Sequence, residues 1–250
     1  MKTYEEAIRD AARLISAAKY LIAFTGAGIS VESGIPPFRG EQGLWSIYDP
    51  EHFEISYFIS HPEECWATLK KIFYERFEKA SPNEAHNVLS RLEKHGLLKA
   101  VITQNIDNLH RRAGSTNVVE YHGSSRELVC LECKKHYEVD PILINKPQMR
   151  CSCGGLLKPD FVFFGEEIPQ KALQAVWCET AKTDLMLIIG TTGEIFPASQ
   201  IPIEAKCSGA KLVEINVEPS NYSDGITDIY LEGKASEVLK DLEDNIELQI

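Results

Sequence analysis

Short apolar segments alternate with longer amphipathic ones along most of the chain. Tyr20 to Thr25 is a continuous apolar run that ends in glycines, which is typical of a strand buried on both faces. A helix is predicted from about Thr3 to Ala18, because apolar residues recur at helical spacing and Thr3 with Glu6 matches a capping box. Further strands are predicted at 99–103, 160–164, 184–190 and 211–216, and further helices near 84–95, 170–182, 197–208 and 235–245.

This alternation predicts an α/β fold in which a parallel sheet carries helices on both faces. Two stretches interrupt it. Residues 41–82 carry aromatic side chains and a long helical pattern from about Pro62 to Lys79, and residues 127–156 hold paired cysteines. We expect both stretches to be insertions that form a smaller lobe, while residues 1–40, 83–126 and 157–250 form the discontinuous sheet domain.

The overall charge narrows the classes of partner. With 44% hydrophobic and 25% charged residues the composition is that of a globular protein, and a net charge of −11 argues against direct nucleic-acid binding. The same charge suits a cationic partner such as a lysine-rich peptide. No apolar run is long enough to span a bilayer, and the segment from Met1 to Glu6 lacks the pattern of an export signal. We therefore expect no membrane partner and a cytoplasmic location, with the nucleus still open.

A glycine-rich turn follows the first predicted strand. In Gly26-Ala27-Gly28-Ile29-Ser30, small residues let backbone N–H groups approach a pyrophosphate. The pattern is incomplete, because Val31 stands where the full Gly-x-Gly-x-x-Gly motif has its third glycine, and a tight turn without a ligand is an equally good interpretation. The next loop presents Phe38, which suits the covering of a sugar face, and Arg39, which suits a phosphate.

Polar side chains gather directly after the strand predicted at 99–103. Gln104, Asn105 and Asp107 carry amide and carboxyl groups that suit a carboxamide and ribose hydroxyls, and ligands of parallel sheets bind at this end of the strands. Helix capping by Asn105 or Asp107 is the competing interpretation. His122 ends another short predicted strand and is a candidate general base, because imidazole titrates near neutral pH.

Four of the seven cysteines form two close pairs. Cys130 and Cys133 are followed, after 17 intervening residues, by Cys151 and Cys153, a spacing typical of one tetrahedral zinc site. Four thiolates would fill the coordination sphere, so the metal would be structural. The second pair is shortened to Cys-x-Cys, and the two glycines that follow it would supply the backbone freedom for a tighter turn. A redox disulfide or unrelated thiols are the alternatives, and His136 is a possible substitute ligand.

Taken together, these segments resemble the sirtuin family. Agreement extends to Phe163-Phe164-Gly165-Glu166, to Gly190-Thr191-Thr192 and to Ile215-Asn216, and the similarity is colinear from about residue 5 to 245. The resemblance implies a Rossmann-like NAD-binding domain, a small lobe with a helical insertion and a zinc ribbon, and an active cleft between them. It also implies NAD-dependent removal of acetyl, and possibly other acyl, groups from protein lysine side chains, which yields nicotinamide, O-acyl-ADP-ribose and free lysine.

The resemblance implies a role for each matching residue. His122 would be the base, with Asn105 and Asp107 as further catalytic residues. An acyl-lysine peptide, bound as an extended strand, would be flanked by Val162, Phe164, Gly165, Glu166, Glu194, Ile195 and Phe196. NAD, as co-substrate, would be surrounded by Gly26, Ala27, Gly28, Ile29, Ser30, Phe38, Arg39, Gln104, Asn105, Ile106, Asp107, Gly190, Thr191, Thr192, Asn216, Lys234 and Ala235, and one structural Zn²⁺ by Cys130, Cys133, Cys151 and Cys153.

The chain departs from the family pattern at a few positions. Pro37 stands where members often carry Asp or Thr, and Thr192 replaces the more usual Ser while keeping the hydroxyl. The stretch from Trp66 to Phe77 lacks the Tyr-x-x-Arg pair of members that accept acidic acyl groups, so a succinyl preference is not expected. A mono-ADP-ribosyltransferase, a zinc-ribbon nucleic-acid-binding module and a nicotinamide-dependent dehydrogenase are the alternative functions.

Overall fold

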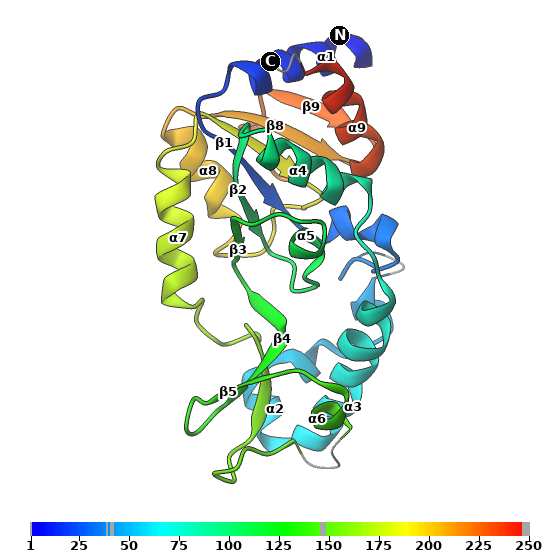
Figure 1. Ribbon diagram of the computed structural model, residues 1–250, viewed down its shortest axis with the longest axis vertical. Coiled ribbons are helices and arrows are strands. Elements are labelled where there is room, and N and C mark those ends of the chain that lie inside the picture. The colour runs from blue at the N-terminus through cyan, green and yellow to red at the C-terminus, as the bar shows by residue number, and fades with distance from the viewer. Residues whose placement is uncertain (1, 39, 41–42, 146–148, 247–250) are drawn as a thin grey trace.

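The computed structural model describes residues 2–38, 40, 43–145 and 149–246. Its larger sheet has the strand order β3-β2-β1-β7-β8-β9, and every neighbouring pair is parallel (Figure 1). The chain steps outward from β1 on one side of the sheet and then begins the other side at β7, which is the doubly wound order of Rossmann-like sheets. The strands are β1 (Leu21–Thr25), β2 (Leu98–Thr103), β3 (Val118–Glu120), β7 (Leu185–Ile189), β8 (Lys211–Asn216) and β9 (Ile229–Glu232).

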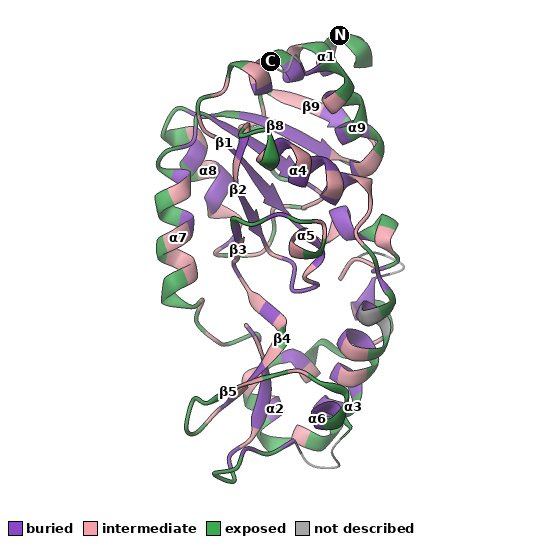
Figure 2. Cartoon of the chain, viewed as in Figure 1, coloured by how far each residue is buried: buried purple, intermediate pink, exposed green. Residues whose placement is uncertain are grey.

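Helices cover both faces of this sheet, as the sequence predicted. Along β1, Leu21 and Ala23 belong to one hydrophobic cluster and Ile22 and Phe24 to the other, because successive side chains of a strand point to opposite faces. The central strands are therefore buried throughout (Figure 2). The first cluster is completed by α1 (Tyr4–Ala17), α4 (Glu84–Lys94) and α9 (Ala235–Asn245), and the second by α7 (Gln170–Thr180) and α8 (Gln200–Cys207).

The predicted helices lie close to their expected positions. The capping box at the start of α1 is confirmed, with the Thr3 side chain accepting from the Glu6 backbone and the Glu6 carboxylate accepting from the Thr3 N–H. The long pattern predicted over 62–79 is helical throughout, as α3 (Pro62–Leu69), a π-helical segment η4 (Lys70–Arg76) and a 3₁₀ turn η5 (Phe77–Lys79). None of the described helices is long and apolar enough to cross a membrane.

A second, antiparallel sheet forms the small lobe. Its order is β5-β4-β6, and it packs with the helical insertion around a cluster rich in aromatic side chains, at the opposite end of the molecule from α1 and α9 (Figure 1). The lobe contains η2 (Leu44–Ser46), η3 (Pro50–Phe53), α2 (Ile55–Ser60), α3, β4 (Gly123–Cys130), β5 (His136–Glu138), α6 (Pro141–Ile144) and β6 (Leu157–Phe161); the short helix α5 (Leu109–Arg112) follows β2.

Three features differ from the sequence prediction. The strand expected at 160–164 in the parallel sheet is β6, which pairs antiparallel with β4, so residues 123–126 and 157–161 extend the small sheet. Pro159 explains this placement, because proline lacks the N–H that a central strand needs and β6 is an edge strand. The turn after β1 opens a 3₁₀ segment, η1 (Ala27–Ser33), and neither this segment nor the edge strand β9 was predicted.

The glycines after β1 and β7 pack backbone against backbone. Gly28 N–H donates to the Gly190 carbonyl at 2.8 Å, and Gly26 N–H donates to the Ile189 carbonyl at 2.9 Å. A Cβ on Gly190 would lie 2.4 Å from the Ile29 nitrogen, and one on Gly28 would lie 2.6 Å from the Gly190 Cα. The close approach at this switch point in the strand order therefore requires glycine on both loops.

Gly190→Ala should destabilise the protein by about 3–5 kcal/mol, because the new Cβ meets backbone atoms and because Gly190 has a positive φ. Gly209→Ala is the matched control. Gly209 also has a positive φ, but no atom lies within 4 Å of the added Cβ, so we expect a loss of only about 1 kcal/mol. Urea unfolding measures both changes, and equal losses would contradict the steric explanation.

Candidate active site

A chain of hydrogen bonds joins the polar segment after β2 to the turn after β1. The Asn105 side-chain N–H₂ donates to the Gly26 carbonyl at 3.0 Å and to Ser30 Oγ at 3.2 Å, and Ser30 Oγ donates to Asp107 Oδ2 at 2.7 Å. Both amide hydrogens of Asn105 are thereby used. Within the described part of the chain no donor reaches Asn105 Oδ1, so this oxygen is available to a donor on a bound molecule.

Asp107 is buried at the end of this chain. Burial raises the pKa of its carboxyl group, and hydrogen bonds from Ser30 and from the Leu109 N–H partly oppose the rise. Helix capping competed with a binding role in the sequence prediction, but the N-cap residue of α5 is Asn108, which makes no side-chain capping bond, and Asp107 precedes it. One oxygen of Asp107 accepts from the N–H of Leu109, the first residue of α5, and the other accepts from the Ser30 hydroxyl.

His122 lies between the two sheets and has a defined protonation pattern. Its Nδ1 is 3.0 Å from the Gln104 carbonyl oxygen, which can only accept, so Nδ1 carries the proton. The neutral ring then has its lone pair on Nε2. Burial lowers the pKa of His122, and the bond to Gln104 partly opposes this. A neutral imidazole with a free Nε2 is the form that acts as a general base.

Side chains from three loops meet above the carboxyl ends of β2, β7 and β8. Gln104 Nε2 donates to Thr191 Oγ1 at 3.1 Å, and Asn216 Nδ2 donates to the Thr191 carbonyl at 3.1 Å. These bonds connect Thr191 and Asn216 to the segment that holds His122. The structure thus brings together predicted residues from four separate stretches of sequence.

A row of buried polar side chains beneath this site was not singled out from the sequence. Thr25 Oγ1 donates to Thr103 Oγ1 at 2.8 Å and lies 3.0 Å from His110 Nε2, and the His110 ring packs on His86. Burial lowers the pKa of both histidines. The capping box that His86 forms with Asn83 was a usable signal, whereas the other contacts have no signature in the sequence.

The segment after β6 is attached to both lobes. Val162 N–H donates to the His122 carbonyl at 2.8 Å, Phe164 N–H donates to the Phe53 carbonyl at 2.8 Å, and Ile55 N–H donates to the Phe164 carbonyl at 3.0 Å. Trp45 lies between Phe38 and Phe164, with ring centroids 5.2 and 6.1 Å away. The predicted substrate residues at 162–166 therefore lie beside His122, and Phe164 among them lies near the Trp45 ring.

Other predicted residues that the structure describes lie at the start of α9 and in the loop after β7. Lys234 is exposed and Ala235 is buried at the start of α9, where Ser236 N–H donates to the Glu32 carboxylate. Ile195 and Phe196 occupy the loop after β7, and the Phe196 side chain is 77% exposed. Thr192 is exposed on the same loop, and Arg39 lies outside the described residues.

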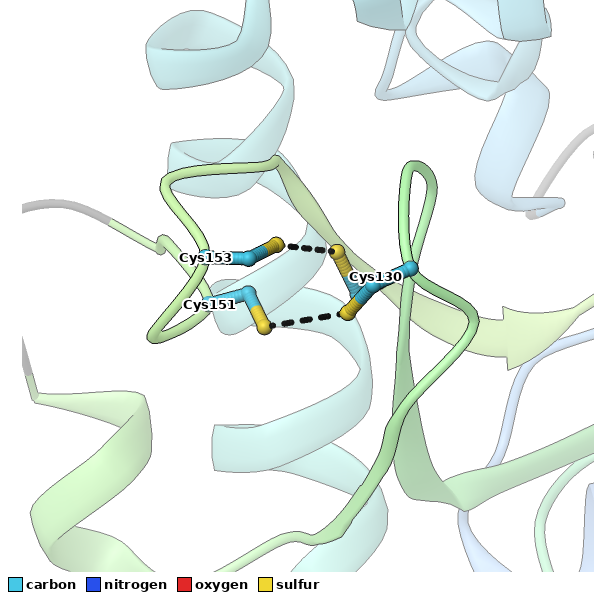
Figure 3. A group of neighbouring side chains, drawn as sticks. Cys130, Cys151 and Cys153 are labelled. Carbon is cyan, nitrogen blue, oxygen red and sulfur yellow. Dashed lines mark hydrogen bonds between the residues drawn. The ribbon is translucent and has the colours of Figure 1, made fainter.

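The four paired cysteines meet at one point of the small lobe. Cys130 Sγ lies 3.6 Å from Cys153 Sγ, and Cys133 Sγ lies 3.5 Å from Cys151 Sγ (Figure 3). All four sulfur atoms lie within 4.8 Å of one another. Sulfur atoms around a tetrahedral zinc ion are about 3.8 Å apart, and those of a disulfide about 2 Å. The cluster therefore fits a structural zinc ion, and His136 does not belong to it.

Glycines shape the shortened second pair, as the sequence predicted. Gly154 has a φ of 91°, and a Cβ on Gly155 would lie 2.7 Å from Cys130 Sγ. Cys151 N–H donates to the Gly155 carbonyl at 2.9 Å, which closes the turn. The Cys-x-Cys spacing is accommodated because the backbone approaches the sulfur atoms closely.

The fold and the site define a protein with a doubly wound parallel sheet and a small lobe that carries a four-cysteine metal site. A family model described as "Sir2 family" matches residues 26–197, and the chain belongs to this family. It is 44% identical over 240 residues to NAD-dependent protein deacetylase 1 of Pyrobaculum aerophilum, covering 95% of this chain and 94% of that protein. It is 45% identical to an NAD-dependent protein deacylase of Aeropyrum pernix, covering 93% and 94%.

Solved structures agree over the same length. A Sir2 homologue in complex with ADP ribose superimposes with a TM-score of 0.91 at 39% identity, covering 95% of each chain. A Sir2 protein with a p53 peptide and NAD⁺ gives a TM-score of 0.87 at 36% identity, covering 98% of each chain. These similarities confirm the predicted sirtuin fold.

Removal of zinc with a chelator should unfold the small lobe, because the four thiolates hold the end of β4 and the turn after it against the turn that precedes β6. We expect a lower thermal transition and loss of bound zinc, and Cys151→Ser should reproduce both effects. Cys178→Ser, which changes an exposed cysteine outside the cluster, should alter neither. An unchanged melting curve after zinc removal would contradict a structural site.

Proposed function

We propose that this chain is an NAD-dependent protein lysine deacylase that acts first on acetyl-lysine. The observation that carries the proposal is the neutral His122, whose Nδ1 is fixed to the Gln104 carbonyl while the same segment continues into Asn105 and Asp107. The proposed base, which follows β3, and the proposed carboxamide-binding groups, which follow β2, thereby lie next to each other at the carboxyl ends of adjacent strands of a dinucleotide-type sheet. The names of the relatives in the Sir2 family support the same activity.

In this proposal NAD supplies the ribose that accepts the acyl group, and nicotinamide leaves. Asn105 Oδ1 accepts from the carboxamide N–H₂, because its own amide hydrogens are already used. Ser30 and Asp107 hold Asn105 in that orientation. His122 Nε2 would take a proton from a ribose hydroxyl, whose oxygen then attacks the acyl carbon. One water molecule is consumed overall, and the products are nicotinamide, O-acyl-ADP-ribose and free lysine.

The other residues assigned to NAD form four groups. Gly26, Ala27, Gly28 and Gly190 provide the close backbone approach, and Gln104, Thr191 and Asn216 add polar side chains. Ile29, Ile106 and Phe38 exclude water. Thr192, Lys234 and Ala235 border the site. Arg39, which lies outside the described residues, is assigned to NAD from the family resemblance alone.

The acyl-lysine peptide is proposed to add as a strand between 162–166 and 194–196. No donor among the described residues reaches the Val162 carbonyl, which leaves it available to the N–H of the acyl-lysine amide. Exposed Phe164 and Phe196 suit the apolar parts of such a peptide. An acylated lysine is neutral, so it enters an apolar channel at a lower desolvation cost than a free lysine.

The domain division follows from this assignment. We propose that residues 1–40, 83–126 and 157–250 bind NAD, with 41–82 and 127–156 as the two inserted parts of the small lobe, although β4 and β6 extend the small sheet toward the site. None of the seven cysteines, all within the described residues, forms a disulfide, and four of them form the thiolate zinc site. Both features fit a reducing compartment, and we propose the cytoplasm.

The central test is nicotinamide release from NAD in the presence of an acetyl-lysine peptide. His122→Ala should lower the rate by about 10²–10⁴-fold, because the general base is lost. The matched control is His95→Ala, which changes an exposed histidine and should leave the rate unchanged. Mass spectrometry of the products separates deacylation from ADP-ribosylation of the peptide. Equal rates in the two variants would reject the role of His122.

The pH dependence should show the lowered pKa of His122. A base works only when neutral, so kcat/KM should stay constant as the pH falls and decline only below the ordinary histidine value of 6.5. Measurement of kcat/KM for the acetyl peptide from pH 5 to 9 gives this limb. An acidic limb centred above pH 6.5 would show that His122 is not buried in the working enzyme.

A further inference from the structure

Lys158, in β6, is a buried lysine that the proposed chemistry does not use. Only 4% of the residue is exposed, and burial lowers the pKa of its ammonium group, with Glu166 opposing the shift. Lysine is rarely buried unless its charge is paired. A group placed at such a desolvation cost, next to the segment assigned to the peptide, calls for an explanation.

The surroundings of Lys158 satisfy its charge fully. Its Nζ lies 2.9 Å from the Pro159 carbonyl oxygen, 2.5 Å from the Phe161 carbonyl oxygen and 3.0 Å from Glu166 Oε2. The ammonium has three hydrogens and therefore a partner for each. It also lies 4.4 Å from the centroid of the Phe163 ring, a cation–π contact.

Glu166 ties the other end of the segment to the same point. The oxygen that pairs with Lys158 also accepts the Phe163 N–H at 2.8 Å, and the Glu166 N–H donates to the Phe163 carbonyl at 3.0 Å. Its carboxylate therefore points inward, to Lys158 and the backbone. We call the ion pair with these backbone bonds the Lys158–Glu166 brace.

The brace spans residues 158–166, and the other backbone hydrogen bonds of this stretch join it to both lobes. Val162 N–H donates to the His122 carbonyl, and Phe164 exchanges two bonds with Phe53 and Ile55. Directly after these attachments the chain turns through Gly165, which has a φ of 86°. The brace joins Phe163 to Glu166 across this turn, and Phe163 directly follows Val162, whose carbonyl is proposed to bind the peptide.

We propose that Lys158 and Glu166 are positioning residues that hold 161–166 in the shape that accepts the acyl-lysine peptide, without touching the substrate. This inference rests on the proposed deacylase function. It assigns to Glu166 an inward, structural task in place of the peptide contact that the family resemblance implies. Loss of the brace should weaken peptide binding while NAD binding, which uses the other sheet, is retained.

The test compares Lys158→Met, Glu166→Gln and the double variant with the wild-type protein. Lys135→Met, which changes an exposed lysine of the same lobe, is the control. We expect the KM for an acetyl-lysine peptide to rise about tenfold, a loss of binding free energy of about 1.4 kcal/mol. The KM for NAD should change less than roughly twofold, since a uniform effect would indicate general loosening.

Hydrogen exchange of the Val162 and Phe163 amides gives a second readout that needs no catalysis. Exchange should be faster in each variant and unchanged in the control. Glu166→Gln should melt lower than the double variant, because it leaves a buried ammonium without its carboxylate, whereas the double variant leaves no charge. If a single variant does not fold, the double variant carries both measurements.

Unchanged exchange with an unchanged peptide KM would overturn the proposal, and so would equal rises in the KM for peptide and NAD. An inactive wild-type protein would refute the deacylase function by itself. The brace would then be judged by exchange, where faster Val162 and Phe163 amides support it and unchanged ones overturn it.

Discussion

The contact between the backbones of Gly28 and Gly190 is the constraint on which the site depends. These residues follow β1 and β7, the two adjacent strands at which the direction of the sheet order changes. Because neither loop carries a side chain at the contact, the loops approach within hydrogen-bonding distance. That approach brings Thr191 within reach of Gln104 and Asn216, and so joins β2, β7 and β8 at their carboxyl ends.

The small sheet connects the cysteine cluster to the catalytic centre. β4 begins directly after His122 and ends at Cys130, while β6 begins opposite Cys130 and leads to Val162. The hydrogen bond from Val162 N–H to the His122 carbonyl closes this pair of strands at the site end. A metal bound at the far end would thus stabilise the strand pair whose other end holds His122, the proposed base, and the segment proposed to bind peptide, which gives a structural ion a physical link to activity.

Three buried ionisable groups in and beside the site are stabilised in different ways. Around Asp107, burial and hydrogen bonds from Ser30 and Leu109 act in opposite directions on the carboxyl pKa. Around His122, burial favours the neutral ring and a backbone carbonyl selects the tautomer. Around Lys158, a carboxylate and two carbonyls keep a buried charge paired. Each group is held in one orientation by its contacts. These contacts leave Nε2 of His122 free, and they leave no hydrogen of the Lys158 ammonium group unpaired.

The sequence by itself determined the elements and the types of residue at the site. Apolar runs and helical periodicity predicted the strands and helices of the large sheet, and cysteine spacing predicted the metal cluster, because these signals are local. The sequence patterns misplaced β6 and missed β9, because the neighbour with which a short strand pairs cannot be read from the residues of that strand alone. The tertiary structure alone decided that Nδ1 of His122 faces a carbonyl, that Lys158 is buried against Glu166 and that Thr25, Thr103 and His110 support the site. These contacts join residues far apart in sequence, and packing sets them.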